Sequence, residues 1–466
     1  MVMLGVLGCG LAAFTCLRFT PLSWNVALAA AAVGSAFAPL PAAGAALGIV
    51  TALVRTGANP RSSRATSQLI KNEWLAIGTD SQRRLVRIPL RASSGAHALV
   101  VGATGSGKTV TEAWIVARAI EHGHGAVILD PKGDDLLRGA AREGALAAGR
   151  EFLEWTPRGP GVYNPYAHGS ASEIADKALA GESYSEPHYL RQAQRYIAHA
   201  VRAAGPGLTP RRLLELMDPR ELELAARRLA DERAARALFG YLDSLGARER
   251  SGLAGTRDRL AILVESELGP WLEPRPGLVC IDLLTAVRSR SIVYFRLEAD
   301  RLPLLAHMLG AAIVQDLLTV AAACQRAPVP AIVVIDEFSA IGAGAVARLF
   351  GRARAAGLNM LLATQELADL RAGGDELLEQ VLGNVETVVA HRQSVPDSAE
   401  LIAQIAGTRV VWNRSVELSH NIATGRSTRT QGREYVLHPD AIKSLAPGSA
   451  AVAGPGVCAI AQIFHP

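Results

Sequence analysis

The chain has 466 residues and a formal net charge of +5, and 49% of its residues are hydrophobic. This length exceeds one ordinary domain and predicts two or three structural units. The basic charge is weak evidence for a nucleic-acid partner, because 43 of the 48 Lys and Arg residues are Arg in an Ala-rich chain, a bias typical of a GC-rich genome. The five cysteines show no metal-binding spacing, which argues against a cysteine-ligated zinc site.

The first 54 residues are strongly apolar, and Arg18 is their only charged residue. Two apolar stretches, 1–17 and 26–54, approach or exceed the roughly 17–25 residues that cross a bilayer as a helix. A cleaved secretory signal is the alternative, but it needs a basic leader and would leave the second stretch unexplained. We therefore predict a two-helix transmembrane hairpin at 1–54, in which Pro39 and Pro41 make the second span kinked or partly re-entrant.

Basic residues gather directly after the second apolar stretch. Segment 55–91 carries eight Lys and Arg residues against Glu73 and Asp80, a net charge of +6. Basic residues that flank a membrane span stay in the cytoplasm, so both chain ends are expected there. We predict a multi-pass protein of the inner (cytoplasmic) membrane, with a basic juxtamembrane segment at 55–91 and a cytoplasmic domain after it.

A complete phosphate-loop motif follows this segment. An apolar run from Ala96 to Val101 predicts a strand, and a helical pattern begins at Val110. The spacing GxxxxGK[ST] between a strand and a helix is typical of a nucleotide site, where backbone N–H groups and the helix N-terminus cradle phosphates. We expect Lys108 to reach the β- and γ-phosphates of ATP and the Thr109 hydroxyl to hold Mg²⁺. The predicted nucleotide-binding residues are Gly102, Ala103, Thr104, Gly105, Ser106, Gly107, Lys108 and Thr109.

A second motif of nucleotide hydrolases lies at 332–337, where four apolar residues precede Asp336 and Glu337. Burial of such a strand fixes both carboxylates at its carboxyl end, beside the phosphate loop. Asp336 is then expected to hold Mg²⁺ through water, and Glu337 to polarise the attacking water. The alternative is a buried strand that ends in a solvated turn, and the upstream phosphate loop argues against it.

Two weaker signals accompany these motifs. Gln365 follows the next apolar run, and in a RecA-like layout a Gln at this place touches the γ-phosphate or its water. A helix before that run carries Arg348, Arg352 and Arg354. One of them could serve as an arginine finger in a neighbouring subunit's site, a role worth about 10³–10⁵ in rate. A solvated basic face is the alternative for these arginines.

Alternating strands and helices predict an α/β fold with a parallel-rich sheet. Strand-like runs occur at 125–130, 291–297, 331–335, 359–363 and 387–390, and a long helix is expected at 304–323. The helical periodicity of 172–271 predicts an all-α insertion. We expect a RecA-like P-loop ATPase domain in two parts, 92–164 and 276–466, around an insertion domain at 165–275.

Residues that contact nucleic acid are harder to identify from the sequence than the nucleotide site. A polar, Arg-bearing stretch at 413–433 predicts a hairpin or loop, and further arginines lie near the end of the insertion. A ring motor would grip backbone phosphates with such side chains. An ordinary surface role is the alternative, and no single residue is assigned. The candidates are Arg409, Arg414, Arg426, Arg429, Arg433, Arg248, Arg250, Arg257 and Arg259.

Together these features resemble the type IV secretion system coupling proteins, the conjugative DNA-transfer ATPases (TraG/TraD-like family). The resemblance spans nearly the whole chain. Its more specific elements are the apolar hairpin, the PKGD turn at 131–134, the RAAGL segment at 354–358 and the HPDAI segment at 438–442. The short loop between the apolar stretches and the compact carboxyl end depart from the family pattern, which puts envelope contacts and tail-mediated cargo docking in doubt.

The resemblance implies a homo-hexameric ATPase ring on a membrane stem, with Arg354 as the inter-subunit finger and Gln365 as the γ-phosphate sensor. It implies ATP and Mg²⁺ as cofactors. It also implies a cargo of DNA, single-stranded with an attached relaxase, or of protein, delivered to secretion channel proteins. One alternative is a double-strand DNA translocase of the FtsK/HerA type, although such pumps carry more spans and a further DNA-reading domain. Another is a nucleotide-gated receptor that presents cargo without hydrolysis.

Overall fold

The structure, a computed structural model, describes residues 70–466 apart from residues 72, 183, 185, 342, 373, 374, 420 and 421. The transmembrane hairpin predicted at 1–54 lies outside the described residues. The chain divides into two units, Met1–Lys71 and Asn72–Pro466. In the first unit the structure describes only the short strand β1 (Ile70–Lys71). The second unit holds every predicted site residue.

A large sheet forms the centre of the second unit. Seven of its strands are parallel, in the spatial order β12-β4-β11-β10-β5-β9-β6. Burial on both faces explains why these strands are apolar along most of their length. The seven strands are β4 (His97–Val101), β5 (Gly125–Asp130), β6 (Phe152–Trp155), β9 (Ile292–Arg296), β10 (Ala331–Ile335), β11 (Leu358–Thr364) and β12 (Thr387–Ala390).

Antiparallel strands extend the sheet beyond β12. They are β15 (Ser449–Gly454), β16 (Val457–Ile463), β2 (Trp74–Thr79) and β3 (Leu85–Pro89). The sequence assigned the last two to a basic juxtamembrane segment, whereas the structure places them in the sheet. Most of their apolar residues are buried, among them Leu75, Ile77, Val86 and Ile88, whereas Arg83 and Arg84 lie in the turn and Arg87 is half-buried on β3.

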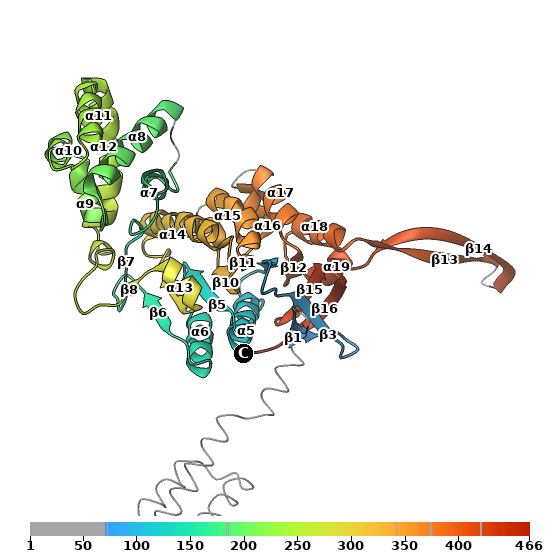
Figure 1. Ribbon diagram of the computed structural model, residues 1–466. Helices are drawn as coiled ribbons and strands as arrows, with labels where there is room; N and C mark the ends of the chain where they lie inside the picture. Colours follow the sequence, from blue (N-terminus) through green and yellow to red (C-terminus); the bar gives the residue numbers. More distant parts are fainter. Residues whose placement is uncertain are drawn as a thin grey trace, which may run out of the picture. The chain divides into compact units, whose positions relative to one another are not determined.

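Helices cover both faces of the sheet (Figure 1). On one face lie α5 (Lys108–Glu121) and α6 (Asp135–Ala147). The helices of the other face share one apolar core with the sheet; they are α13 (Leu283–Ser289), α14 (Pro303–Cys324), α15 (Ala343–Ala355), α16 (Leu367–Ala372), α17 (Asp375–Asn384) and α18 (Pro396–Ala406). Among the described residues α14 is the one helix long and apolar enough to span a membrane, and 78% of its apolar window is buried in the protein, as in a core helix.

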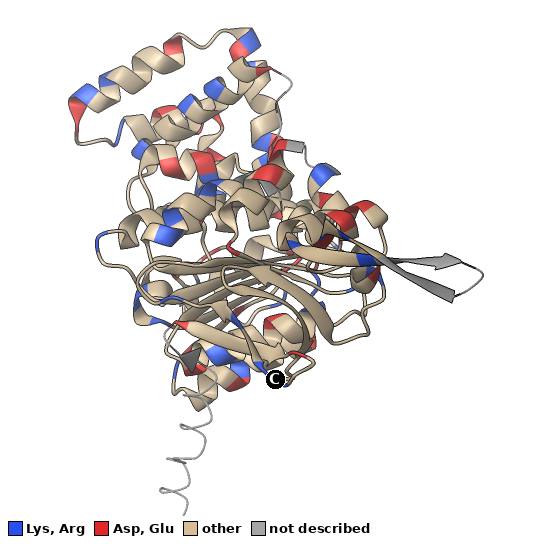
Figure 2. Ribbon diagram, turned by 90° about the vertical axis from the view of Figure 1, so that its right-hand side faces the viewer, with Lys and Arg blue, Asp and Glu red and all other residues tan. Residues whose placement is uncertain are grey.

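Six helices occupy the region between Ala171 and Glu265, and the structure describes no strand there. Figure 2 shows acidic and basic residues interspersed on this part of the chain. The helices pack around their own core, separate from that of the sheet. They are α7 (Ala171–Ala178), α8 (Pro187–Ala204), α9 (Pro210–Leu216), α10 (Pro219–Ala226), α11 (Glu232–Asp243) and α12 (Ala247–Glu265).

Capping residues set the starts of these helices. Ser170 and Glu173 form a reciprocal capping box at α7, and Thr209, Asp218 and Asp231 accept N–H bonds at the starts of α9, α10 and α11. Proline at the first turn of α8, α9 and α10 costs no hydrogen bond, because those N–H groups have no helical partner.

A buried ion pair ties the first insertion helix to α14. The Lys177 ammonium donates to Asp316 Oδ1 at 2.6 Å, and Tyr163 donates its hydroxyl to the other carboxylate oxygen at 2.8 Å. Lys177 also donates to the carbonyl of His168. The pair satisfies two groups that would be costly to bury alone.

Shorter elements complete the unit. Strands β7 (Val162–Tyr163) and β8 (Cys280–Ile281) form a small parallel pair, and β13 (Thr408–Ser419) and β14 (Ile422–Tyr435) form a two-stranded ribbon. The ribbon is longer than the hairpin expected at 413–433. The remaining elements are the 3₁₀ turns η1 (Gly269–Trp271) and η2 (Phe338–Ile341) and helix α19 (Pro439–Lys443).

Candidate nucleotide site

The phosphate loop runs from the end of β4 to the start of α5, as the motif predicts. Gly105 and Gly107 have φ values of 76° and 111°, in the left-handed region that glycine adopts without strain. Gly102 is required for a different reason, since a Cβ there would lie 2.5 Å from Ser106 Oγ and 2.7 Å from His391 Cβ. Local geometry therefore favours glycine at each of the three positions.

Residues far away in the sequence brace this loop from behind. Gly448 donates its N–H to the carbonyl of Ser106 at 2.9 Å, and Gly102 donates to Thr364 at 3.2 Å. His391, which follows β12, lies 2.8 Å from the hydroxyl of Thr111 through Nε2. Burial lowers the pKa of His391 to about 4, so the imidazole is neutral at physiological pH. Its role behind the loop is to form hydrogen bonds.

Strand β10 delivers the two predicted carboxylates to the same edge of the sheet. It lies one strand away from β4, with β11 between them. Asp336 donates its N–H to Leu129 on β5 at 3.0 Å, which fixes the turn. Glu337 then adopts a φ of 42°, a strained conformation for a residue with a side chain, and its N–H donates to Asp336 Oδ1 at 2.9 Å. Such strain persists only where the surroundings hold it.

The predicted side chains converge on Glu337. The Lys108 ammonium donates to Asp336 Oδ1 and lies 3.6 Å from Glu337 Oε2. Gln365 Nε2 donates to the same Glu337 oxygen at 3.1 Å, and Thr104 Oγ1 lies 3.5 Å from the Gln365 amide oxygen. The structure thus brings together residues of the phosphate loop, the strand carboxylates and the Gln after β11.

Nearby opposite charges determine the protonation states of Glu337 and Lys108. Burial alone would raise the pKa of Glu337, but the ammonium groups of Lys108 and Lys132 hold it below its usual value. Burial alone would lower the pKa of Lys108, but the nearby carboxylates of Glu112, Asp336 and Glu337 raise it instead. Both groups are therefore charged at neutral pH, as a phosphate-binding lysine and a water-polarising carboxylate must be.

These residues fit ATP and Mg²⁺. The Lys108 ammonium forms ion pairs with the carboxylates of Asp336 and Glu337, so its position suits anionic oxygen ligands. Asp336 and the hydroxyl of Thr109 are the oxygen donors that Mg²⁺ prefers. Thr109 stands in the first turn of α5, directly after Lys108. When bound, the metal would neutralise charge on the phosphates.

The sequence analysis did not assign Lys132 to the site. Its ammonium donates to Glu337 Oε2 at 3.0 Å. The PKGD turn presents it, because Asp130 accepts the N–H groups of Lys132, Gly133 and Asp134 and the hydroxyl of Tyr294. The sequence does show that a lysine follows an apolar strand. It does not show that this strand, β5, lies beside β10, and this pairing brings Lys132 to Glu337.

Glu112 is a second residue that the sequence analysis missed. It lies one helical turn after Lys108, is fully buried, and neither of its carboxyl oxygens has a hydrogen-bond partner among the described residues. Burial and the charge of Asp336 raise its pKa well above the usual value. Its spacing of four residues from Lys108 was the available signal.

Arg354 lies away from its own chain's nucleotide site. It stands at the end of α15, before β11, and its guanidinium donates to the carbonyl of Asn384 at 3.2 Å and lies 3.6 Å from Glu386. Gln365 follows the other end of β11, and a strand of this length spans about 20 Å. Arg354 therefore cannot reach the phosphate loop of its own chain. Arg348 lies 3.5 Å from Gln315 on α14, also away from the loop.

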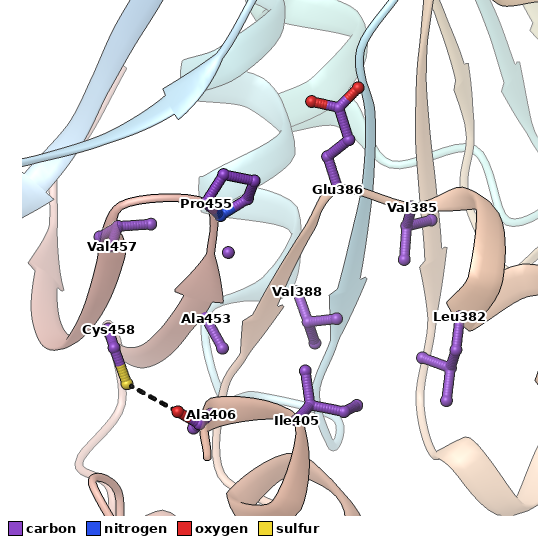
Figure 3. Close-up of a pocket in the computed structure, with 11 residues that line it drawn as sticks. Leu382, Val385, Glu386, Val388, Ile405, Ala406, Ala453, Pro455, Val457 and Cys458 are labelled. Atoms are coloured by element: carbon purple, nitrogen blue, oxygen red, sulfur yellow. Dashed lines mark hydrogen bonds between the residues drawn. The ribbon is translucent and has the colours of Figure 1, made fainter. Parts of the chain in front are cut away.

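A cavity of about 310 Å³ lies near Arg354 and is distinct from the nucleotide site (Figure 3). Glu386, the partner of Arg354, belongs to its lining, together with Val388 of β12 and Ile405 of α18. Because β12 runs parallel to β4, its amino end lies at the sheet edge opposite the phosphate loop. The cavity lining is largely apolar, with none of the phosphate-loop residues.

Comparisons with known proteins agree with this fold. Residues 330–447 match the family model for the TraM recognition site of TraD and TraG, and residues 75–138 match that for the central domain of helicase HerA. No curated protein matches the sequence.

Among solved structures, the chain is similar to the bacterial conjugative coupling protein TrwB in its unbound monoclinic form, at 16% identity and a TM-score of 0.60, over 85% of this chain and 90% of that chain. It is similar to TrwB in complex with ADP and Mg²⁺, at 18% identity and a TM-score of 0.59 over the same shares. VirB4 of Thermoanaerobacter pseudethanolicus matches at 13% identity and a TM-score of 0.55, over 85% of this chain and 98% of that chain. The resemblance to type IV secretion coupling proteins predicted from the sequence is confirmed, and the fold is a mixed α/β P-loop ATPase fold.

Proposed function

We propose that the protein is a membrane-anchored ATPase that couples ATP hydrolysis to the recruitment and translocation of DNA, or of protein cargo, into a type IV secretion channel. The observation that carries the proposal is the convergence of Lys108, Gln365 and Lys132 on one oxygen of Glu337. A protein that only bound nucleotide would need no charged carboxylate at this place.

Each residue of the site has a distinct role in the proposed hydrolysis of ATP. The loop and Lys108 would bind and orient the phosphates, and Asp336 and Thr109 would hold Mg²⁺. Glu337, kept ionised by its two lysine neighbours, accepts a hydrogen bond from water and takes its proton as the water attacks. Gln365 lies between Glu337 and Thr104, where it can orient the same water. Arg354 would enter the site of a neighbouring subunit, which implies a ring such as a hexamer.

The test is ATP turnover by the full chain in detergent, with and without single-stranded DNA. Glu337→Gln should bind ATP with near wild-type affinity and turn over about 10²–10⁴ times more slowly. Lys108→Ala should lose nucleotide binding. Wild-type turnover in Glu337→Gln would show that the base is assigned wrongly.

One observation favours a second candidate, a double-strand DNA translocase. Residues 75–138 match the model of the helicase HerA central domain. Stimulation of ATPase by duplex DNA but not by single strands would favour this pump. The reverse pattern would favour the coupling function.

A receptor that presents cargo without hydrolysis is the remaining alternative. The charged state of Glu337 and its contact with Gln365 argue against it, because such a receptor has no use for a water-activating set. An assembled, cargo-bound protein that consumes no ATP would establish the receptor instead.

A further inference from the structure

The ribbon of β13 and β14 is a sheet of its own. The two strands pair with each other, and the structure describes no other strand beside them. Their register is regular from Thr408, opposite Tyr435, to Val416, opposite Ser427. Because neighbouring side chains of a strand point to opposite faces, residues paired across the ribbon share a face. The ribbon therefore presents two faces that can be compared residue by residue.

One face combines arginines with exposed apolar groups. Val410 lies opposite Arg433, Trp412 opposite Gln431, and Arg414 opposite Arg429. Trp412 is 54% exposed and Val410 is 49% exposed, although burial is the usual fate of such side chains. No ion pair joins any of these three arginines to an acidic residue within the described side chains. We call this set the basic-aromatic face.

The guanidinium of Arg429 stacks over the ring of Trp412, 4.7 Å from its centroid. The stack leaves Trp412 54% exposed. It also confirms that residues diagonal across the two strands lie on one face. A flat, exposed ring beside guanidinium groups is the arrangement that stacks a nucleobase and binds its phosphate.

The opposite face is different in character. Arg409 lies opposite the acidic Glu434, and the following pairs join Val411 to Gly432, Asn413 to Thr430 and Ser415 to Thr428. These following pairs carry no charge and no aromatic ring. The ribbon thus separates a basic-aromatic face from a neutral one, and residues of the neutral face are matched controls.

We propose that the basic-aromatic face of the ribbon binds single-stranded DNA, with Trp412 stacking on a base and Arg414, Arg429 and Arg433 binding phosphates. The proposal names a DNA-contacting surface for the ATPase proposed above and rests on that function. The uncompensated positive charge selects a polyanion, and the exposed indole selects one with unpaired bases over a duplex or an acidic protein. Arg259, another candidate from the sequence, is excluded, because it is buried and bonds to the carbonyls of Ala178 and Ala180.

The experiment measures binding of a fluorescent oligo(dT) strand to the full chain in detergent, without nucleotide, over a series of salt concentrations. Trp412→Ala should weaken binding about tenfold, the size typical of one stacked base, and Trp412→Phe should recover most of it. Arg414→Gln/Arg433→Gln should weaken binding and reduce the slope of log K against log salt by about 1.4, since each single-strand phosphate contact contributes about 0.7. Arg409→Gln on the neutral face should bind within about twofold of wild type.

Thermal melting of each variant checks that it folds. Wild-type binding by Trp412→Ala and by the double variant would overturn the proposal and leave an acidic protein as the occupant of this face. An equal loss in Arg409→Gln would overturn it too, by showing that the contribution is general charge. Equal affinity for duplex, insensitive to Trp412→Ala, would refute the single-strand assignment. ATPase measured in parallel separates the two proposals, because a chain that binds oligo(dT) through Trp412 but hydrolyses no ATP contradicts only the proposed motor.

Discussion

The nucleotide site and the β13–β14 ribbon treat charge in opposite ways. At the nucleotide site, Lys108 and Lys132 are paired with Asp336 and Glu337, and Lys108 and both acids are buried. On the ribbon, Arg414 is exposed and faces another arginine across the strands. The first region holds its charges in fixed places by pairing them, whereas the second leaves them exposed to solvent.

This difference teaches how the two regions are suited to their ligands. Buried, paired charges are preorganised, so little reorganisation is needed when the reaction begins. Exposed side chains on a ribbon can adapt to the polymer proposed as their ligand, and their attraction is strong only when that ligand brings the opposite charge. Substitutions should therefore act on turnover and stability in the first region, and on ligand affinity in the second.

The largest expected effect concerns Arg354, which the fold keeps away from its own site. Glu337→Gln and Arg354→Ala should each reduce turnover, the latter by about 10³-fold or more. Co-expressed in one ring, they should recover activity, because about a quarter of the interfaces then combine an intact Glu337 with an intact Arg354 from a neighbour. Steady-state ATPase of the mixed, purified rings checks this.

The matched control replaces the Arg354→Ala partner by a Glu337→Gln/Arg354→Ala double variant, so that no interface has both groups. That mixture should stay inactive. If the first mixture is equally inactive, or if Arg354→Ala alone turns over at the wild-type rate, Arg354 does not act in the nucleotide site of a neighbouring subunit.

The buried pair of Lys177 and Asp316 extends the comparison to stability. Lys177→Met should destabilise the protein by about 3–5 kcal/mol, because it leaves Asp316 buried without a counter-charge. Adding Asp316→Asn should recover part of the loss. Arg414→Gln on the exposed ribbon should change stability by less than about 0.5 kcal/mol. Denaturant midpoints measure all three, and equal effects of Lys177→Met and Arg414→Gln would contradict the distinction.

Acid should destabilise the sheet through two neutral histidines. Burial lowers the pKa of His97 and of His391 to about 4 each. As pH falls below about 6.5 the unfolded chain takes up these protons first, so each histidine should remove about 2 kcal/mol of stability between pH 7 and pH 5. His97→Gln should roughly halve this pH dependence. The exposed His188→Gln is the control, and an unchanged midpoint in wild type at pH 5 would refute the assignment.

The smallest effect is expected at Lys132. Lys132→Met should lower the rate of turnover by about 1.5- to 5-fold, in keeping with the 0.2–1 kcal/mol typical of a part-exposed ion pair. Because Lys132 lowers the pKa of Glu337, its removal should shift the acid limb of the pH–rate profile to higher pH. Lys132→Arg should retain the wild-type limb. A limb that does not move would show that Lys132 only shapes the turn.

The local parts of the candidate site can be recognised in the sequence. The phosphate loop and the Asp336–Glu337 pair are encoded in short, contiguous motifs, and each follows an apolar strand whose burial the composition already indicates. Gln365 was predicted from its place after the next strand, and the structure confirms that this strand lies between β4 and β10.

What the sequence could not predict depends on long-range neighbours. The contact of Lys132 with Glu337 requires that β5 lie beside β10, and the brace on the phosphate loop requires residues such as His391 and Gly448. Strands β2 and β3 were missed because their arginines suggested a membrane-proximal segment. The ribbon was expected, but its two unlike faces emerge only when the cross-strand register is known.

The brace that Gly448 provides to Ser106 has a consequence for biosynthesis. The phosphate loop is translated early. The N–H of Gly448, which binds its backbone, is made only after the insertion, the ribbon and α19. A nascent chain therefore lacks this hydrogen bond until its last strands are made. The braced form of the loop is completed only at the end of synthesis.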